Sequence, residues 1–189
     1  MTTRGSYAKG IAKREEILTL ALDVIARHGY RGASVKEIAD AVGLSQAGLL
    51  HYFDSKIELF TAVLIKRDKV DLERATGDIL EDLVNIVAHN AEVPGLVQLF
   101  AQLSIEATDP DHPAHAFFVE RYAGLRQKLA ARIRDGQSDG SFSDALAPDR
   151  VAALIVAATD GLQTQFLLDP SIDMAAELRS LIEGFRRPQ

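Results

Sequence analysis

The stretch Ser34–Lys56, SVKEIADAVGLSQAGLLHYFDSK, decides the fold of this chain. It contains two short helical patterns separated by a glycine, followed by the first residues of another helix. Ser34 and Glu37 have the Ser-x-x-Glu spacing of a capping box, in which each side chain accepts a hydrogen bond from the other residue's backbone amide. Two short helices joined by a tight turn form a helix-turn-helix, which places its second helix in the major groove of DNA.

Three positions in this stretch are sterically constrained, because the two helices of such a motif cross closely. Ala39 is small enough to lie at the crossing. Gly43 tolerates the positive φ angle that the turn requires. Leu49 is the apolar residue that packs the second helix onto the first. The spacing Ala-x3-Gly-x5-Leu therefore agrees with a helix-turn-helix at 34–53.

The second helix of the motif is expected over about 46–53, with Ser45 as its N-cap. A helix of only two turns is not stable alone in water, so Leu49 and Phe53 must anchor it on the neighbouring helices. Its opposite side can contact DNA, and Gln46 in particular can present a bidentate amide to adenine. The expected DNA-binding residues are Ser34, Lys36, Ser45, Gln46, Ala47, Gly48, Leu50, His51, Tyr52 and Lys56.

Outward from this motif, apolar residues recur only at helical spacing, and no strand pattern is present. A polar, basic arm over 2–13 is expected to lead into a helix over about 11–28, which Gly29 ends. A long helix starts at Lys56, and the polar segment 66–76 is expected to be a solvated connection. Further helices are expected over 78–90, 95–107, 113–135, 148–168 and 172–187.

The composition is that of a folded soluble protein: of 189 residues, 47% are hydrophobic and 25% are charged, and none is cysteine. The net charge of −6 is unevenly spread. Residues 1–67 carry a formal charge of +3 and residues 68–189 carry −9, so the N-terminal part is the one suited to a polyanion. There is no signal-like N-terminal segment and no run of 18 apolar residues. We therefore expect a cytoplasmic protein that does not engage a membrane.

From Ser34 to Phe60 the sequence resembles the N-terminal domain of TetR-type transcriptional regulators. The matching features are Ser34 at a helix start, Gly43-Leu44-Ser45 in the turn, His51-Tyr52-Phe53, and Ser55-Lys56-Ile57-Glu58-Leu59. The sequence departs from the family pattern at Gly48, where many members carry Thr, and at Leu50, where many carry Tyr. The resemblance implies a DNA-binding domain over 11–71 but does not give the sequence of its operator.

The same resemblance implies that the helices over 77–189 bind a small-molecule effector and form a homodimer. An effector pocket needs apolar walls and a few convergent polar groups. The candidate effector-binding residues are His89, Phe100, Glu106, Phe118, Tyr122, Asp160, Gln163 and Thr164, with Gln102 and Phe117 as further positions. The helix over 148–168 is apolar around much of its circumference and needs partners on two sides, one of which can be a second subunit. The expected dimer-interface residues are Leu154, Ala158, Leu162, Phe166, Leu178, Ile182 and Phe185.

The segment Asp109–His115 contains two carboxylates and two histidines that could ligate zinc: Asp109, Asp111, His112 and His115. Its prolines fit better as a loop followed by a helix start at Pro113. The chain also has no phosphate-binding glycine loop and no Ser/His/Asp arrangement at a recognisable spacing. We therefore expect no metal, no cofactor and no enzymatic activity.

Together these patterns predict an all-α fold of about nine helices. A three-helix DNA-binding domain with a helix-turn-helix is joined by a fourth helix to a larger helical domain for effector binding and dimerisation. The expected function is that of a ligand-responsive transcriptional regulator, a repressor that a small molecule releases from a palindromic operator in double-stranded DNA. Two alternatives stay open: a constitutive DNA-binding or architectural protein, and an all-α enzyme with a vestigial helix-turn-helix.

Overall fold

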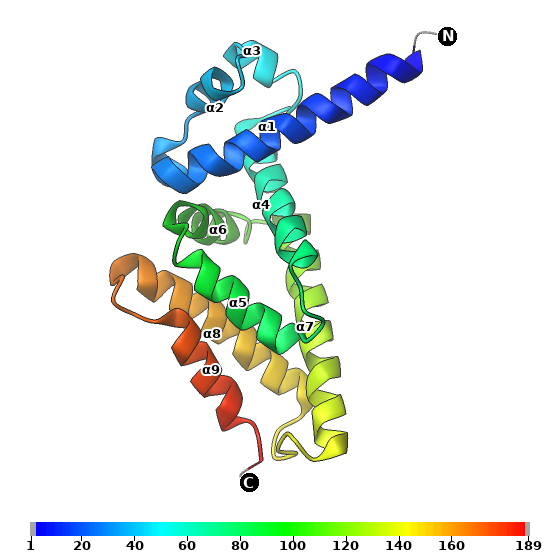
Figure 1. The fold of residues 1–189 in the computed structure, drawn as a ribbon, viewed down its shortest axis with the longest axis vertical. Coiled ribbons are helices and arrows are strands. Elements are labelled where there is room, and N and C mark those ends of the chain that lie inside the picture. The colour runs from blue at the N-terminus through cyan, green and yellow to red at the C-terminus, as the bar shows by residue number, and fades with distance from the viewer. Residues whose placement is uncertain (1–2, 188–189) are drawn as a thin grey trace. The chain divides into compact units, whose positions relative to one another are not determined.

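The computed structural model describes residues 3–187, with the side chains of residues 3–7 and 31 left undescribed, and this part of the chain is α-helical (Figure 1). Its helices are α1 (Thr3–Gly32), α2 (Val35–Ala41), α3 (Gln46–Leu49), α4 (Lys56–Glu73), α5 (Ile79–Asn90), α6 (Pro94–Glu106), α7 (His115–Asp139), α8 (Pro148–Leu168) and α9 (Met174–Gly184). Within the described residues, β-type pairing is limited to one bridge between Phe142 and Arg186. The predicted all-α fold is confirmed.

These helices form two compact units. Unit 1 contains residues up to 73 together with 93–115, and unit 2 contains 74–92 together with residues from 116 onward. Helix α6 therefore belongs to the same unit as the helix-turn-helix, although the sequence separates it from α4 by the whole of α5. The expected boundary between 71 and 77 was drawn along the chain, whereas packing assigns α6 to the N-terminal helices. The functional division of the chain at that boundary stays a prediction.

Unit 1 is built on α1, which contacts α2, α4 and α6. The apolar stripe of α1 supplies the buried side chains Ile17, Ala21 and Ile25, as its helical spacing predicts. Glycine is required where α6 begins, because a Cβ atom on Gly95 would lie 2.1 Å from the carbonyl oxygen of Ile25. This close approach fixes the start of α6 against the end of α1.

Several helix ends differ from the sequence-based expectation. Helix α1 begins at Thr3, so described residues of the expected arm are helical, and it continues to Gly32 across a kink at Gly29, whose φ is 67°. The segment expected to be a solvated connection is helical as far as Glu73, because α4 continues through it and buries Arg67. There the guanidinium of Arg67 lies over the Phe100 ring, 5.3 Å from the ring centre.

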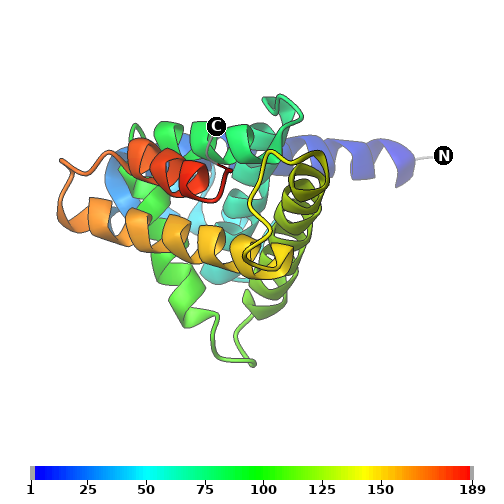
Figure 2. The ribbon, with the colours of Figure 1, turned by 90° about the horizontal axis from the view of Figure 1, so that it is seen from below.

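Unit 2 contains α5, α8, α9 and most of α7, and α8 runs beside α9 (Figure 2). Its core includes Leu83, Leu129 and Ile155, from three of those helices. Helix α7 was expected to end at 135, before Gly136, but it continues to Asp139. Instead, Gly136 is a packing position: a Cβ atom there would lie 2.4 Å from a ring carbon of Phe142.

Helix α8 is long and apolar enough to cross a membrane by length and composition, with a mean hydropathy of 1.4 over its best window. Its buried residues Val151, Ala152 and Ile155 pack in the core of unit 2, which accounts for this composition. The helix also buries the polar side chains of Thr159 and Gln163. Both features are those of a core helix in a folded domain.

Candidate nucleic-acid interface

The helix-turn-helix is positioned by hydrogen bonds that its sequence specifies locally. The Oγ of Ser34 accepts from the Glu37 amide at 3.1 Å, and the Glu37 carboxylate accepts from the Ser34 amide at 2.8 Å. Gly43 adopts a φ of 68° in the turn. Ser45 then caps α3, with its Oγ accepting from the Gly48 amide at 3.0 Å. The predicted capping box, turn glycine and N-cap are all confirmed.

The buried side chains of the helix-turn-helix hold α3 in place. Ala39 and Leu49 are fully buried and Phe53 is 1% exposed, as the Ala-x3-Gly-x5-Leu spacing predicts. The guanidinium of Arg14 lies 4.5 Å from the centre of the Phe53 ring and 3.1 Å from the Glu58 carboxylate. The segment from α3 to Phe53 is therefore held by α2 and by Arg14 of α1, which in turn pairs with Glu58 of α4.

The outward side of α3 presents Gln46, Ala47, Leu50 and His51 to solvent. Regular hydrogen bonds place these residues on one face, because the amide of Leu50 donates to the Gln46 carbonyl and that of His51 donates to the Ala47 carbonyl. Helix α3 was expected to reach Phe53 but ends at Leu49. The chain then tightens into a turn in which the backbone amide of Tyr52 donates to the Leu49 carbonyl. The face nevertheless extends to His51.

Gly48 and Tyr52, also expected to contact DNA, are half-buried at the margins of this face. A Cβ atom on Gly48 would lie 3.2 Å from the Ser45 Oγ, so the missing side chain leaves room for the cap. The Tyr52 ring packs edge-on against His51, with the ring centres 5.8 Å apart. Both residues therefore support the face, and their contact with DNA stays a prediction.

Three of the expected DNA-binding residues, Ser34, Lys36 and Lys56, lie at the starts of α2 and α4. Lys36 is exposed in the first turn of α2, but the amide of Ser34 is already occupied by Glu37, whose pKa is lowered by the hydrogen bonds from Ser34. The ammonium of Lys56 lies over the rings of Tyr30 and Phe60, at 5.5 and 5.0 Å. Lys36 is thus the least engaged of the three side chains.

In unit 2, the structure brings together four of the candidate effector residues on α7 and α8. The Tyr122 hydroxyl donates to the Asp160 carboxylate at 2.7 Å, and the Phe118 ring lies 6.2 Å from the Tyr122 ring. Burial raises the pKa of Asp160, although the hydrogen bond from Tyr122 and the charge of Arg121 oppose this shift. Phe117 extends the aromatic group, with its ring 5.0 Å from that of Phe118.

A buried polar pair joins α5 to α8 in the same unit. Gln163 is 6% exposed, and its Oε1 accepts from the side-chain amide of Asn90, which is 4% exposed. Sequence reasoning selected Gln163 but missed Asn90. The spacing contained the signal, since Asn90 follows Leu83 and Val87 on the buried stripe of α5.

The remaining candidate effector residues lie elsewhere. Phe100 and Glu106 belong to α6 in unit 1, where the Glu106 carboxylate accepts from Gln102 at 2.8 Å and from Tyr30 at 3.4 Å. His89 is paired with Glu92 at 3.0 Å on the surface of α5. Thr164 is exposed and donates to a carbonyl of its own helix. The eight candidates are therefore divided between two units, and their shared role stays a prediction.

The expected dimer residues divide into buried and accessible sets. Leu178, Ile182 and Phe166 are 0%, 3% and 7% exposed and pack in the core of unit 2, so they offer little surface to a second subunit. Leu154 is 45% exposed. The half-buried residues are Ala158, Leu162 and Phe185.

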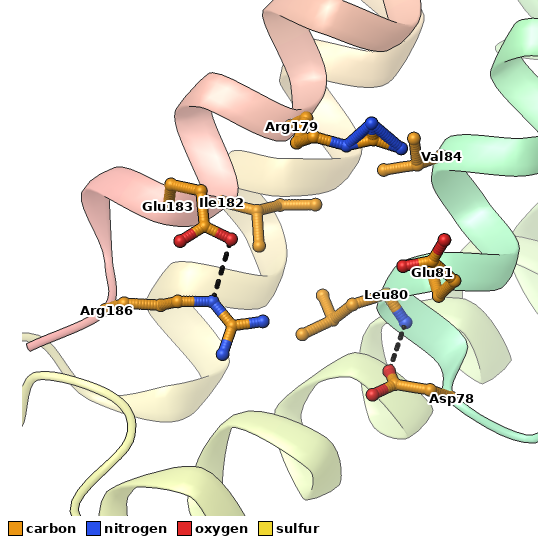
Figure 3. Close-up of a pocket in the computed structure, with 8 residues that line it drawn as sticks. All are labelled: Asp78, Leu80, Glu81, Val84, Arg179, Ile182, Glu183 and Arg186. Atoms are coloured by element: carbon orange, nitrogen blue, oxygen red, sulfur yellow. Dashed lines mark hydrogen bonds and ion pairs between the residues drawn. The ribbon is translucent and has the colours of Figure 1, made fainter.

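A small open groove of about 80 Å³ lies between α5 and α9 (Figure 3). Its charged side chains engage groups nearby: Arg186 donates to Glu183 at 2.9 Å, and Asp78 accepts from the amide of Leu80 at 3.0 Å. Leu80, Val84 and Ile182 are its apolar lining. None of the candidate effector residues lines this groove.

The segment from Asp109 to His115 uses its polar groups in local turns. Asp109 accepts from the Asp111 amide at 3.0 Å, and His112 accepts from the Ala114 amide at 3.2 Å. His115, which begins α7 two residues after the expected Pro113, approaches the Ala107 carbonyl at 2.8 Å. These bonds order the loop between α6 and α7.

Comparison with known proteins identifies two matching sequence families. Residues 17–63 match the bacterial regulatory proteins of the tetR family, and residues 96–186 match the C-terminal region of BetI-type transcriptional repressors. Among curated relatives, the HTH-type transcriptional repressor KstR2 of Rhodococcus jostii is 31% identical over 146 residues, which cover 69% of this chain and 68% of that protein.

Two further relatives extend over more of the chain. The HTH-type transcriptional repressor SCO4008 of Streptomyces coelicolor is 32% identical over 152 residues, covering 78% of this chain and 77% of the relative. Among solved structures, a putative transcriptional regulator from Saccharomonospora viridis in complex with choline is 28% identical with a TM-score of 0.74. That match covers 93% of this chain and 98% of the other.

Proposed function

This chain belongs to the TetR family of bacterial transcriptional regulators, and we propose that it is a repressor released from its operator by a small molecule. The TetR family is a family of regulators rather than of enzymes, and the relatives KstR2 and SCO4008 are repressors. A regulator of this class binds DNA through the helix-turn-helix. The enzyme and the architectural alternatives are therefore not favoured.

The observation that carries the proposal is the exposed face of α3, a helix whose opposite side is buried and holds it in place. Gln46, Ala47, Leu50 and His51 face solvent while Leu49 is fully buried. Because the helix is already fixed in place, its backbone loses little conformational entropy when it binds. The arrangement suits a helix that enters the major groove with its side chains directed at base edges.

Selection of duplexes from the chain's own genomic DNA, at a stated salt concentration, tests DNA binding. We expect the purified protein to retain a palindromic sequence from near its own gene. A reporter driven by that sequence should be repressed when the protein is produced. Retention of all duplexes with equal affinity would contradict a sequence-specific repressor and favour an architectural protein.

For the effector, we propose an organic cation that binds at Asp160. Removing a carboxylate from water is costly unless it is paired. Asp160 is half-buried, Tyr122 supplies it with a neutral donor, and Phe118 adds a second ring on α7. Aromatic faces and a carboxylate together attract quaternary ammonium groups. The similar regulator from Saccharomonospora viridis in complex with choline supports this class of ligand.

Choline and tetramethylammonium are the probes for this proposal, measured by thermal shift and by release of bound operator. A ligand that binds the native state raises the melting temperature, and Asp160→Asn should abolish that rise. Asp135→Asn, an exposed change on α7, is the matched control and should leave it intact. An equal response in both variants would place the cation elsewhere.

We also propose that the repressor is a cytoplasmic homodimer joined in part through α8. The exposed residues Leu154, Ala157 and Leu168 lie on this helix. A two-fold axis would present two copies of α3 to the two halves of a palindrome, about one DNA turn apart.

A further inference from the structure

The recognition face of α3 is apolar at its centre. Leu50 is 41% exposed, whereas the adjacent Leu49 is fully buried. Ala47, also exposed, lies one helical turn before His51 and beside Leu50 on the same face. A large exposed apolar side chain on a DNA-facing helix has a natural partner in the major groove, because thymine is the base that carries a methyl group there.

The polar groups around this centre complement the same base pair. Gln46 precedes Ala47 and is exposed, and its amide matches the N6 and N7 atoms of adenine. Residues 44–53, LSQAGLLHYF, contain no lysine or arginine, the side chains that most often bind guanine in a bidentate manner. They also contain no aspartate or glutamate to accept from cytosine.

We propose that Leu50 and Ala47 read thymine methyl groups, so that each half of the operator places A·T pairs beneath α3. This inference rests on the proposed function, because it concerns how the repressor chooses its DNA. Leu50 is the specificity-determining residue: its side chain covers the C5-methyl group of thymine and excludes water from it. Ala47 contacts the same or the neighbouring methyl group.

The test replaces thymine by uracil, which removes the methyl group and keeps every hydrogen-bonding atom. The highest-affinity duplex is first selected from a random library, and its thymines are then replaced one at a time. Fluorescence anisotropy of the wild-type protein measures each affinity at constant salt. We expect about a fourfold loss at one or two thymines in each half-site, equivalent to about 0.8 kcal/mol for one buried carbon group.

Leu50→Ala connects this loss to a residue. The variant should bind the unmodified operator more weakly and should show little further loss with uracil at the same position. Leu72→Ala makes the same substitution at a side chain of α4 that is 66% exposed, and it should retain the full effect of uracil. Because Leu50 is exposed, its replacement should leave the melting temperature nearly unchanged.

Three results would overturn the inference. Specific binding with no loss at any uracil would exclude methyl recognition while preserving the proposed repressor. An undiminished uracil effect in Leu50→Ala would assign the methyl contact to a different residue. Selection of no preferred sequence would reject the proposed function itself, and the inference with it.

Discussion

Single hydrogen bonds to short polar side chains set the geometry of both candidate sites. Ser45 holds the start of α3 through its bond to the Gly48 amide at 3.0 Å. Tyr122 holds the Asp160 carboxylate at 2.7 Å. The first bond satisfies an amide that would otherwise lack a partner at a helix start, and the second compensates part of the cost of burying a carboxylate. Each bond can be removed by one substitution.

Ser45→Ala should lower the free energy of unfolding by about 1 kcal/mol, the usual cost of losing an N-cap. Operator affinity should fall as well, because α3 has few other hydrogen bonds to hold its first turn. Urea denaturation and anisotropy measure the two effects. Ser180→Ala removes an exposed hydroxyl bonded within α9 and should change stability by less than about 0.5 kcal/mol. Equal losses in both variants would deny Ser45 a special role.

Asp160→Asn should raise the melting temperature of the ligand-free protein at pH 7. Burial raises the pKa of Asp160 in the native state, so the native protein binds this proton more readily than the unfolded chain does. Wild-type stability therefore falls as pH rises from the ordinary aspartate pKa through the raised native pKa. The gain in melting temperature of Asp160→Asn over the wild type should therefore be complete at pH values above the raised native pKa and should vanish below the ordinary aspartate pKa.

Thermal melts from pH 3 to pH 8 measure this dependence. Asp135→Asn, on the exposed side of α7, should show no comparable pH-dependent gain. A wild-type protein that is more stable than Asp160→Asn at pH 7 would mean that the carboxylate is favourably paired in the native state, against the direction of the pKa shift.

At the scale of helices, unit 1 depends on the contact between α1 and α6. A Cβ atom on Gly95 would lie 2.1 Å from the Ile25 carbonyl oxygen and 2.9 Å from that of Ala26. These are backbone atoms, which cannot move aside as a flexible side chain can. The glycine therefore allows α6 to begin directly against α1, and it ties an element distant in sequence to the DNA-binding helices.

Gly95→Ala should destabilise the protein by about 1–3 kcal/mol, the range for an overpacked core position. Operator affinity should also fall, since α1 must shift. Gly124→Ala in α7 meets no atom within 4 Å of the added Cβ and should instead stabilise by up to about 1 kcal/mol through helix propensity. Chemical denaturation of both variants checks the opposite signs. A stabilising Gly95→Ala would mean that the two helices are not in close contact.

The sequence predicted those features of the helices that local signals encode. The capping box at Ser34, the N-cap at Ser45 and the buried Leu49 follow from side chains within one turn of each other. Features that depend on distant partners were not predictable in this way. Gly136 was interpreted as a break because its partner Phe142 comes from the following loop, and polar residues around Arg67 concealed the continuation of α4.

In the candidate sites, too, the sequence predicted what depends on nearby residues and not what depends on distant partners. The exposed face of α3 was predicted, since its inward residues are fixed by spacing and the outward ones follow. The effector candidates were chosen as polar or aromatic residues on apolar helices, a criterion that cannot tell which helices adjoin. It therefore grouped Glu106 of unit 1 with Asp160 of unit 2, and it passed over Asn90, the partner of Gln163.

For the molecule as a whole, charge and exposed surface agree with a DNA-binding oligomer. Residues 1–67, which include the helix-turn-helix, carry a formal charge of +3 within a chain of −6, and this sign of charge suits a polyanion. The exposed apolar residues of α8 include Leu154 at 45% and Leu168 at 84%. A second subunit would bury such residues, and it would supply the second recognition helix that a palindrome requires.

Leu154→Glu should convert the proposed dimer to a monomer, because two carboxylates would be buried near the symmetry axis. Analytical ultracentrifugation at micromolar concentration measures the change. Leu72→Glu, at a residue of α4 that is 66% exposed, should remain dimeric. A Leu154→Glu protein with the sedimentation of the wild type would remove this part of α8 from the interface.

The central claim, that α3 is the helix that reads DNA, is tested most directly by anisotropy titration of the selected operator at constant salt. The key variant combines Gln46→Ala with Tyr52→Phe, which removes two polar groups and keeps the Tyr52 ring. Gln127→Ala, an exposed change on α7, is the control. We predict at least a tenfold loss of affinity for the double variant, since a bidentate base contact provides about 1–3 kcal/mol, and none for the control. Unchanged affinity in the double variant would contradict the assignment of α3 as the recognition helix.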